Sequence, residues 1–345
     1  MKIARCLILL GLSGAALAAA AGERPYTVAQ RLPLGGDGGW DYLSADPQAH
    51  LLYLSRADHV SVVDTRSGTQ IAAIADTPGV HGIALAPELG RGFISAGKAD
   101  LVKVFDLKTR AVLATVATGA GPDAILYDAA SQRVFAFNGH GHSATVIDAR
   151  SNAVLATLPL GGKPEFARAD GHGMVYVNIE DTAELVAIDA ATATLKARWP
   201  LPHCEEPSGL ALDAAHRRSF STCGNETLAV LDIDSGKAVA NVPIGKGVDG
   251  AEFDPARQLV FSANGEGTLT LVRERGPDDY VVQQTLTTQR GARTIALDAA
   301  THQLYLPTAE FGPTPAPTTD TPHPRPQAIS GSFVVLVVSD APERK

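Results

Sequence analysis

Several sequence features that often reveal a function are missing from this chain. It contains no Cys-x-x-Cys-His for an attached haem, no Gly-x-Ser-x-Gly of a serine hydrolase, no phosphate-binding loop and no zinc-finger spacing of Cys and His. Positive charge is also scarce, because 29 lysines and arginines face 37 aspartates and glutamates and no basic stripe is visible. We therefore expect no binding of nucleic acid, and the acidic balance favours neutral, cationic or metal partners.

Long apolar runs are also scarce, and the only candidate lies at the start of the chain. Lys2 and Arg5 precede an apolar stretch rich in Leu and Ala, from Cys6 to Ala21. Its strongly apolar part is too short to span a bilayer and small residues follow it directly, which is typical of a cleaved signal peptide rather than a membrane anchor. We expect residues 1–21 to be removed, leaving 22–345 as a single domain that is periplasmic or secreted and not embedded in a membrane.

The most informative feature of the sequence is a four-part phrase that recurs about every 42 residues. In one copy the parts are Pro122–Asp128, Arg133–Asn138, Ala144–Asp148 and Val154–Leu158. The other copies begin near Trp40, His81, Glu165, Ser208, Asp249 and Arg293. Such regularity over most of the chain indicates a repeat architecture.

Each part of the phrase is about four to six residues long, rich in Val, Ile, Leu, Phe and Tyr, and bounded by Gly, Asp, Asn or Pro. This composition is typical of short β-strands rather than helices. Four strands per repeat predict the blade of a propeller, so the chain is expected to be an all-β, seven-bladed β-propeller with four antiparallel strands per blade. A solenoid is the competing fold, but it would leave sheet edges open at both ends.

The ends of the chain predict how the ring closes. The seventh repeat ends at Phe333–Val338 and has no fourth strand after it. At the other end, Arg31–Gly36 copies the outer-strand phrase Thr157–Gly162. We therefore expect Tyr26–Leu34 to complete the last blade, which would remove two free sheet edges at once.

The repeat also carries a family resemblance. Segments such as Met174–Asn178, followed by Val186–Asp189 and a turn, resemble the repeats of the YVTN-repeat seven-bladed propellers, the YncE-like proteins. The resemblance covers essentially all of the chain after residue 21. It implies the propeller fold and very little about function, since one scaffold can serve many roles.

Two columns of aspartates are expected to be structural, where a column is the set of residues at one equivalent position in the successive repeats. Asp side chains accept hydrogen bonds from nearby backbone amides in turns. One column follows the third strand of each blade, at Asp64, Asp106, Asp148, Asp189 and Asp232. The other follows the first strand, at Asp46, Asp128, Asp170, Asp213, Asp254 and Asp298.

A third column lies at the upstream end of the innermost strands, on the opposite face of the disc. Counted five residues back from the first-strand turns, its members are Asp41, His81, Asp123, Glu165, Ser208, Asp249 and Arg293, and Glu206 is expected to fill the place of Ser208. Because they share one repeat position, we expect them to surround one mouth of the central channel. A turn requirement would repeat one residue type, so this mixture favours a binding or catalytic site over a solvated structural ring.

The polar mouth predicts a propeller that binds a small ligand, an ion or an envelope protein. The alternative is an enzyme, because propeller lactonases and lyases resemble this arrangement, with channel carboxylates and histidine around a divalent cation. A divalent cation is therefore the one cofactor that the mouth suggests. No motif of those families is matched, so a metal-dependent hydrolase or lyase and a binding protein both stay open at this point.

Other loops on the same face add weaker candidates. His140 and His142 lie two apart in a Gly-rich loop and are possible metal ligands. Residues 307–330 form a Pro-rich excursion without a strand pattern, which is interpreted as a passive insertion or as an arm over the mouth.

The two cysteines beyond the apolar stretch predict a disulfide. Cys204 lies in the connection before the fifth blade, and Cys223 lies in the loop after that blade's second strand, on the same face. An exported protein would keep such a bond oxidised. The alternatives are two reduced thiols or, with His203, a weak metal site.

Overall fold

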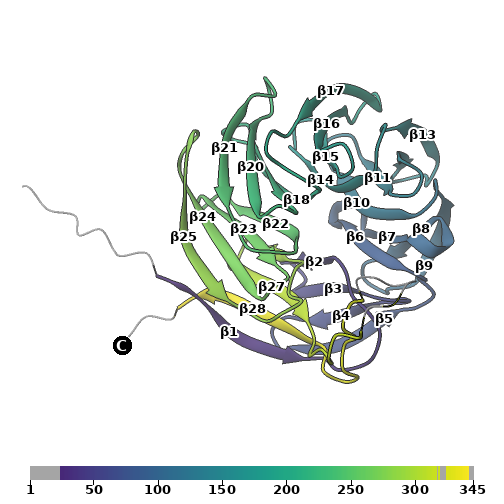
Figure 1. The fold of residues 1–345 in the computed structure, drawn as a ribbon. Helices are drawn as coiled ribbons and strands as arrows, with labels where there is room; N and C mark the ends of the chain where they lie inside the picture. The colour runs from purple at the N-terminus through teal and green to yellow at the C-terminus, as the bar shows by residue number, and fades with distance from the viewer. Residues whose placement is uncertain (1–23, 317, 319–323, 342–345) are drawn as a thin grey trace, which may run out of the picture.

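The computed structural model describes residues 24–316, 318 and 324–341, and within them it shows seven four-stranded sheets arranged in a ring (Figure 1). The predicted signal peptide lies outside the described residues. Regular helix in the described chain is limited to two short 3-10 turns in the second blade, η1 (Pro87–Leu89) and η2 (Gly97–Ala99). No helix in this part of the chain is long and apolar enough to cross a membrane.

Each blade contains four antiparallel strands, which are called first, second, third and outermost in order from the channel outward, while the β labels follow the chain. The innermost strands are β2 (Leu43–Asp46), β6 (Val80–Ala86), β10 (Pro122–Asp128), β14 (Pro164–Ala169), β18 (Pro207–Asp213), β22 (Val248–Asp254) and β26 (Ala296–Asp298). The second strands are β3 (Leu51–Arg56), β7 (Arg91–Ala96), β11 (Arg133–Asn138), β15 (Met174–Ile179), β19 (Arg218–Cys223), β23 (Leu259–Asn264) and β27 (Gln303–Thr308). The third strands are β4 (His59–Asp64), β8 (Leu101–Asp106), β12 (Ser143–Asp148), β16 (Glu184–Asp189), β20 (Thr227–Asp232), β24 (Thr268–Gly276) and β28 (Val334–Asp340). The outermost strands are β5 (Thr69–Ile74), β9 (Val112–Ala117), β13 (Val154–Pro159), β17 (Thr194–Pro200), β21 (Ala238–Pro243), β25 (Asp279–Thr287) and β1 (Tyr26–Pro33).

The core lies between neighbouring blades, where both faces of each sheet are covered. The second and third strands are therefore almost wholly buried and carry apolar residues at their centre, as in β3 and β4. Between blades 1 and 2, for example, Tyr53 packs against Phe105 with ring centroids 5.7 Å apart, and Ile94 completes the layer. The outermost strands show alternating or full exposure, since only one edge meets the sheet.

The two aspartate columns are confirmed as turn residues. Asp148 Oδ1 accepts hydrogen bonds from the backbone amides of Arg150 and Ser151, and Asp232 makes the same pattern in its blade. In the first-strand turns, Asp254 Oδ1 accepts from the amides of Ala256 and Arg257. Each aspartate satisfies backbone donors that the strands leave unpaired.

The predicted closure of the ring is confirmed. Strand β1 pairs antiparallel with β28, in a register that joins Tyr26 to Asp340 and Pro33 to Val334. The strand ends at Pro33, one residue short of the predicted boundary. Gln284 of blade 6 also holds β1, because its side chain exchanges two hydrogen bonds with the backbone of Tyr26.

The Pro-rich insertion starts later than predicted. Pro307 and Thr308 belong to β27, where they pair with Val335 and Val334, so the insertion begins at residue 309. Proline is tolerated there because β26 pairs only as far as Tyr305, so β27 has a free edge on that side at Pro307. The two ends of the insertion form a short stem, in which the Gly312 amide donates to the Gln327 carbonyl.

Candidate functional site

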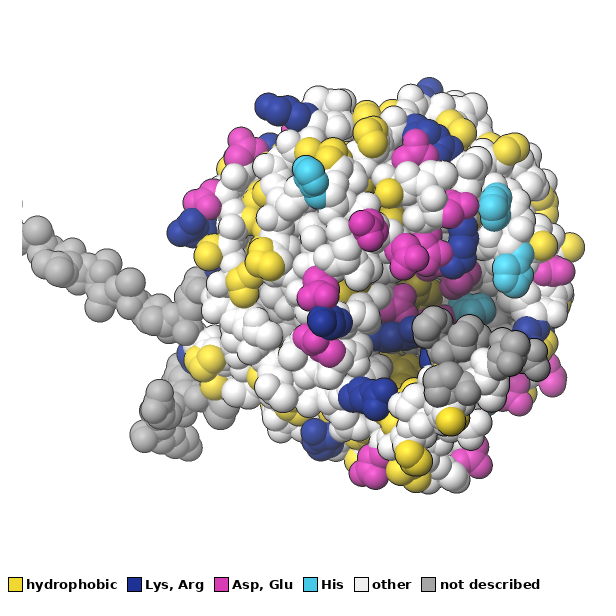
Figure 2. All heavy atoms as spheres, viewed as in Figure 1, with side chains coloured by type: hydrophobic (Ala, Val, Ile, Leu, Met, Phe, Trp, Pro, Cys, Tyr) yellow, Lys and Arg dark blue, Asp and Glu magenta, His cyan; other side chains and the backbone are white. Residues whose placement is uncertain are grey.

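The seven predicted candidates of the channel mouth line one cavity of about 470 Å³. They are Asp41, His81, Asp123, Glu165, Glu206, Asp249 and Arg293. Figure 2 shows acidic, basic and histidine side chains gathered around a hollow on this face of the disc. Because Lys163, Glu180 and Arg325 also line the cavity, six carboxylates face three permanent cations and one histidine.

Irregular strand pairing places the ring of site residues. In five blades the register between the first and second strands shifts at the site position, for example between Val80 and Ile83 around His81 and between Pro122 and Ile125 around Asp123. The same shift occurs in blades 4, 5 and 6. A β-bulge redirects a side chain away from the regular alternation, and bulges are common next to functional sites.

Hydroxyl groups of the framework hold the backbone of the ring. The Asp41 amide donates to Ser55 Oγ at 2.8 Å, and the hydroxyl of Thr294 donates to the Asp41 carbonyl at 2.9 Å. In the next blade the Gly82 amide donates to Ser95 Oγ at 2.8 Å, and the same hydroxyl donates to the Asp123 carbonyl. These bonds tie blade 7 to blade 1 and blade 2 to blade 3, and the Tyr42 amide ties blade 1 to blade 2 by donating to the His81 carbonyl.

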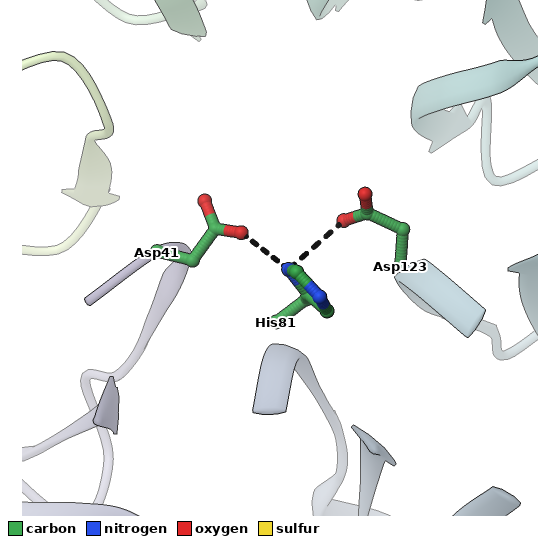
Figure 3. A group of neighbouring side chains, drawn as sticks. All are labelled: Asp41, His81 and Asp123. Carbon is green, nitrogen blue, oxygen red and sulfur yellow. Dashed lines mark hydrogen bonds and ion pairs between the residues drawn. The ribbon is translucent and has the colours of Figure 1, made fainter. Parts of the chain in front are cut away.

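Asp41, His81 and Asp123 form the tightest group in the mouth (Figure 3). Nδ1 of His81 lies 2.6 Å from Asp41 Oδ2 and 3.6 Å from Asp123 Oδ1. Burial disfavours the charged ring, but the hydrogen bond to Asp41 and the charge of Asp123 raise the pKa of His81 to about 9. The free site therefore holds an imidazolium between two carboxyl groups at neutral pH.

Asp123 is the member of this group with unused bonding capacity. Burial raises the pKa of Asp123 to about 6, against the charge of His81 and together with that of Asp41. Its Oδ1 atom is buried and has no hydrogen-bond partner. The donor atoms of Asp41, His81 and Asp123 lie within 4.8 Å of one another, so a small shift would bring all three onto one cation.

A second ion-pair group, which includes Lys163, lies across the mouth. Lys163 Nζ is 2.7 Å from Glu165 Oε1 and also pairs with Glu180. Burial opposes the charge of Lys163, but hydrogen bonds to both carboxylates raise its pKa. Burial and the charge of Asp123 raise the pKa of Glu165 to about 8, although Lys163 acts in the opposite direction. Sequence reasoning did not single out Lys163.

Arg293 and Asp249 form the third charged contact of the ring. Arg293 Nε lies 3.1 Å from Asp249 Oδ2. Burial raises the pKa of Asp249 to about 7 in spite of the arginine, and the charge of Asp249 raises the pKa of Arg293. The fixed cations of the mouth are thus distributed on two sides, and Asp41, His81 and Asp123 lie on a third.

Glu206 occupies an unusual backbone position. Its φ is 48°, and the equivalent residues two places before the ring position in four other blades are the glycines Gly79, Gly121, Gly247 and Gly291, with φ between 62° and 84°. A side chain in this left-handed region is strained relative to glycine. Glu206 nevertheless lines the cavity, together with the mostly buried Ser208 at the ring position.

The aromatic ring of Tyr42 lies at the floor of the mouth. Tyr42 is buried, lines the mouth cavity and also lines a second cavity on the far side of the channel. Its ring contacts Phe166 edge to face, with centroids 4.8 Å apart. Burial raises the pKa of Tyr42 well above its usual value, so the phenol stays neutral. Tyr42 therefore closes the base of a polar cup and separates it from the second cavity.

The weaker sequence candidates lie outside this cup. His140 and His142 are exposed, do not line the cavity, and belong to no group of three or more close potential ligands among the described residues. The predicted disulfide between Cys204 and Cys223 is present, which rules out two reduced thiols or a Cys-based metal site in this structure. It joins the connection before β18 to the end of β19.

One further group of potential ligands was not predicted. Asp213, His216 and Glu274 meet on the opposite face, where His216 Nδ1 lies 2.6 Å from Asp213 Oδ2 and 3.4 Å from Glu274 Oε1. Burial and a hydrogen bond to Asp213 raise the pKa of Glu274 to about 7. Asp213 is one of the turn aspartates, so one member of this group also has a structural role in its blade.

Comparison with known proteins identifies the fold and leaves the family open. No family model matches the chain, and no curated protein matches it. Among solved structures it is similar to the structure of U3-55K, with a TM-score of 0.74 and 10% identity over 89% of this chain and 97% of that one. The RRP9 WD40 repeats give 0.75 and 10% over 90% and 97%, and a chain of the mitotic checkpoint complex gives 0.70 and 16% over 88% and 95%. The resemblance to YVTN-repeat proteins stays a prediction, and what this chain shares with its structural neighbours is the seven-bladed β-propeller fold.

Proposed function

We propose that this protein is a binding propeller that takes a positively charged ligand, in the simplest case a divalent cation, at the channel mouth. The observation that carries the proposal is the convergence of six carboxylates and a histidine on one cavity with only three permanent cations. Crowded carboxylates repel one another and lose hydration, which is why the pKa values of Asp123, Glu165 and Asp249 are raised. A bound cation would reverse both costs.

Asp41, His81 and Asp123 are the residues best suited to hold the cation. Imidazole nitrogen and carboxylate oxygen together suit Zn²⁺ or Mn²⁺ better than Mg²⁺ or Ca²⁺. Binding would displace the proton from His81, since metal and proton compete for the same nitrogen. The affinity should therefore rise with pH up to about 9, the pKa of His81 in the free protein.

The test is thermal unfolding of EDTA-treated protein with added Zn²⁺, Mn²⁺ or Ca²⁺, together with metal analysis of the purified protein. A cation at a hundred times its Kd should stabilise the fold by about 2.7 kcal/mol. Asp123→Asn should abolish that gain, whereas Glu226→Gln, which removes an exposed carboxylate outside the cavity, should keep it. Equal metal effects in all three proteins, or none in any, would contradict the proposal.

A second candidate function is a metal-dependent hydrolase or lyase at the same mouth. The observation that favours it is Glu165, whose pKa near 8 suits a general acid or base at neutral pH. Cation-dependent hydrolysis of a simple aryl lactone or ester that disappears in Glu165→Gln, while cation binding persists, would support the enzyme. Cation binding without turnover would support the binding protein.

Export of the protein belongs to the same proposal. The sequence of residues 1–21 supports it, and so does the Cys204–Cys223 disulfide, because such bonds persist in oxidising compartments. Mass spectrometry of protein recovered from the cell envelope should find an N-terminus close to residue 22. An intact Met1 in the cytoplasmic fraction would contradict it.

A further inference from the structure

A second cavity lies beside the mouth, and its charge is opposite. Its volume is about 640 Å³, and it shares Gly247, Arg293 and Arg325 with the mouth cavity. No carboxylate lines it among the described residues, whereas Arg290 joins the two shared arginines there. We call this cavity the arginine pocket.

Aromatic rings form one wall of the arginine pocket. Trp40 lies between Phe333, at a centroid distance of 5.3 Å, and Phe311, at 6.0 Å. Phe333 is buried, and Trp40 and Phe311 are partly exposed toward the pocket. Their position is fixed, because Phe311 belongs to the hydrogen-bonded stem of the insertion and bridges to Ala328.

A glycine permits this aromatic wall. Gly291 has a φ of 84°, and a Cβ added there would lie 2.5 Å from the ring of Phe311. Any side chain at this position would therefore displace the ring. The close approach keeps Phe311 beside the arginines.

Two of the three arginines of the pocket lack a carboxylate partner within the described part of the chain. The guanidinium of Arg290 lies 5.8 Å from the centre of the Phe311 ring, and neither Arg290 nor Arg325 forms an ion pair with a carboxylate in the described chain. Arg293 alone is paired, with Asp249 on the side of the mouth. Guanidinium groups bind carboxylates with two parallel hydrogen bonds, so this arrangement favours a planar anion.

We infer that the arginine pocket binds a small aromatic carboxylate, with the carboxylate on Arg290 and Arg325 and the ring against Trp40 and Phe311. The volume suits a small molecule, and a mostly apolar wall with a few convergent polar groups is the usual form of such a site. An inorganic anion would use the arginines but not the rings, and a neutral aromatic compound would use only the rings. The inference goes beyond the proposed cation site and does not depend on it.

The fluorescence of Trp40 provides a local test. The chain has two tryptophans, so Trp199→Phe leaves Trp40 as the sole reporter. Benzoate should quench or shift its emission saturably, with a Kd of about 1 mM for so small a ligand. Benzamide, cyclohexanecarboxylate and inorganic phosphate should each bind at least fivefold more weakly. Ligand-observed NMR provides a second measurement that does not depend on Trp40 emission.

Variants that remove one positive charge each distinguish binding in the arginine pocket from general electrostatic attraction of benzoate to the protein. Arg290→Gln and Arg325→Gln should each weaken benzoate binding at least fivefold, whereas Arg66→Gln, an exposed change in a third-strand turn on the opposite face, should alter it less than twofold. Asp123→Asn should leave benzoate binding intact, so failure of the cation site would not affect this result. Equal binding of benzoate and benzamide, equal binding of benzoate and phosphate, insensitivity to both arginine variants, or no saturation by either method would overturn the inference.

Discussion

Replacing Glu165 by glutamine should stabilise the protein at alkaline pH and leave it unchanged at acidic pH. Burial and Asp123 raise the pKa of Glu165 from its usual 4.5 to about 8. Between these two values the folded protein binds a proton that the unfolded chain releases, so stability falls as the pH rises through this window. Glutamine copies the protonated carboxyl group and cannot ionise. Lys163 keeps its second partner, Glu180, in the variant.

The size of the effect follows from the pKa change. One pKa unit corresponds to about 1.4 kcal/mol, so the full rise sets an upper limit of about 5 kcal/mol at pH 9. This rise already includes the opposing effect of Lys163 at 2.7 Å, and a local dielectric well above that of dry protein reduces the free energy further. We expect a gain of about 1–2 kcal/mol at pH 9, which for a chain of about 320 residues raises Tm by about 2 °C.

The assay is calorimetric unfolding at pH 5 and pH 9 in EDTA, because a bound cation would itself favour the ionised carboxylate. Glu226→Gln serves as the control, since it removes an exposed glutamate on the same face. The Tm difference between Glu165→Gln and the parent should be close to zero at pH 5 and positive at pH 9. A lower Tm for Glu165→Gln at pH 9, or an equal change at both pH values, would refute the reasoning.

Three further predictions follow from the fold and the site. Deletion of residues 23–34 removes β1 and should cause aggregation or loss of cooperative unfolding, and a monomer with unchanged Tm would contradict the closure. Replacing Cys204 and Cys223 by serine should cost about 3 kcal/mol in denaturant unfolding, because a loop of about 20 residues is no longer closed; two free thiols in freshly exported protein would argue against the bond. The raised pKa of His81 stabilises the fold below its unfolded value of 6.5, and this is lost as the pH rises through about 9, so His81→Gln should cost about 1 kcal/mol at pH 6, after solvent screening, and less at pH 10.

The repeat made the fold and the ring of site residues predictable. The copies share the length of their strands, their turn aspartates and the spacing between equivalent residues. The position five residues before Asp128 or Asp254 has the same height in each blade, so Asp123 and Asp249 could be placed at one mouth before any distance was known. Ring closure was predictable for the same reason. The pairing of His81 with Asp41 rather than Asp249 was not predictable from the sequence, because it depends on side-chain rotamers and β-bulges.

The repeat also held a signal that was missed. The column two residues before the ring contains glycine in five blades, and its only other members are Lys163 and Glu206. Glu206 keeps a positive φ of 48°, so its side chain is retained despite the backbone preference, and Lys163 marks a second departure from glycine. The arginine pocket had no such signal, because Phe311 and Arg325 lie in an insertion that no other blade contains.

Ring closure by β1 has a consequence for the order of synthesis. Blades 1 to 6 are each built from strands adjacent in the sequence, so each can form soon after its residues emerge. Blade 7 joins β1 to β28, the first and last strands of the described residues, across roughly 300 residues, and such distant contacts form late. Until β28 is made, the outer edge of β27 and the strand β1 stay without the strand that pairs with both of them. A chain that stops before Val334 can never close, and its two open edges are the surfaces by which a protease or a chaperone would distinguish it from the finished protein.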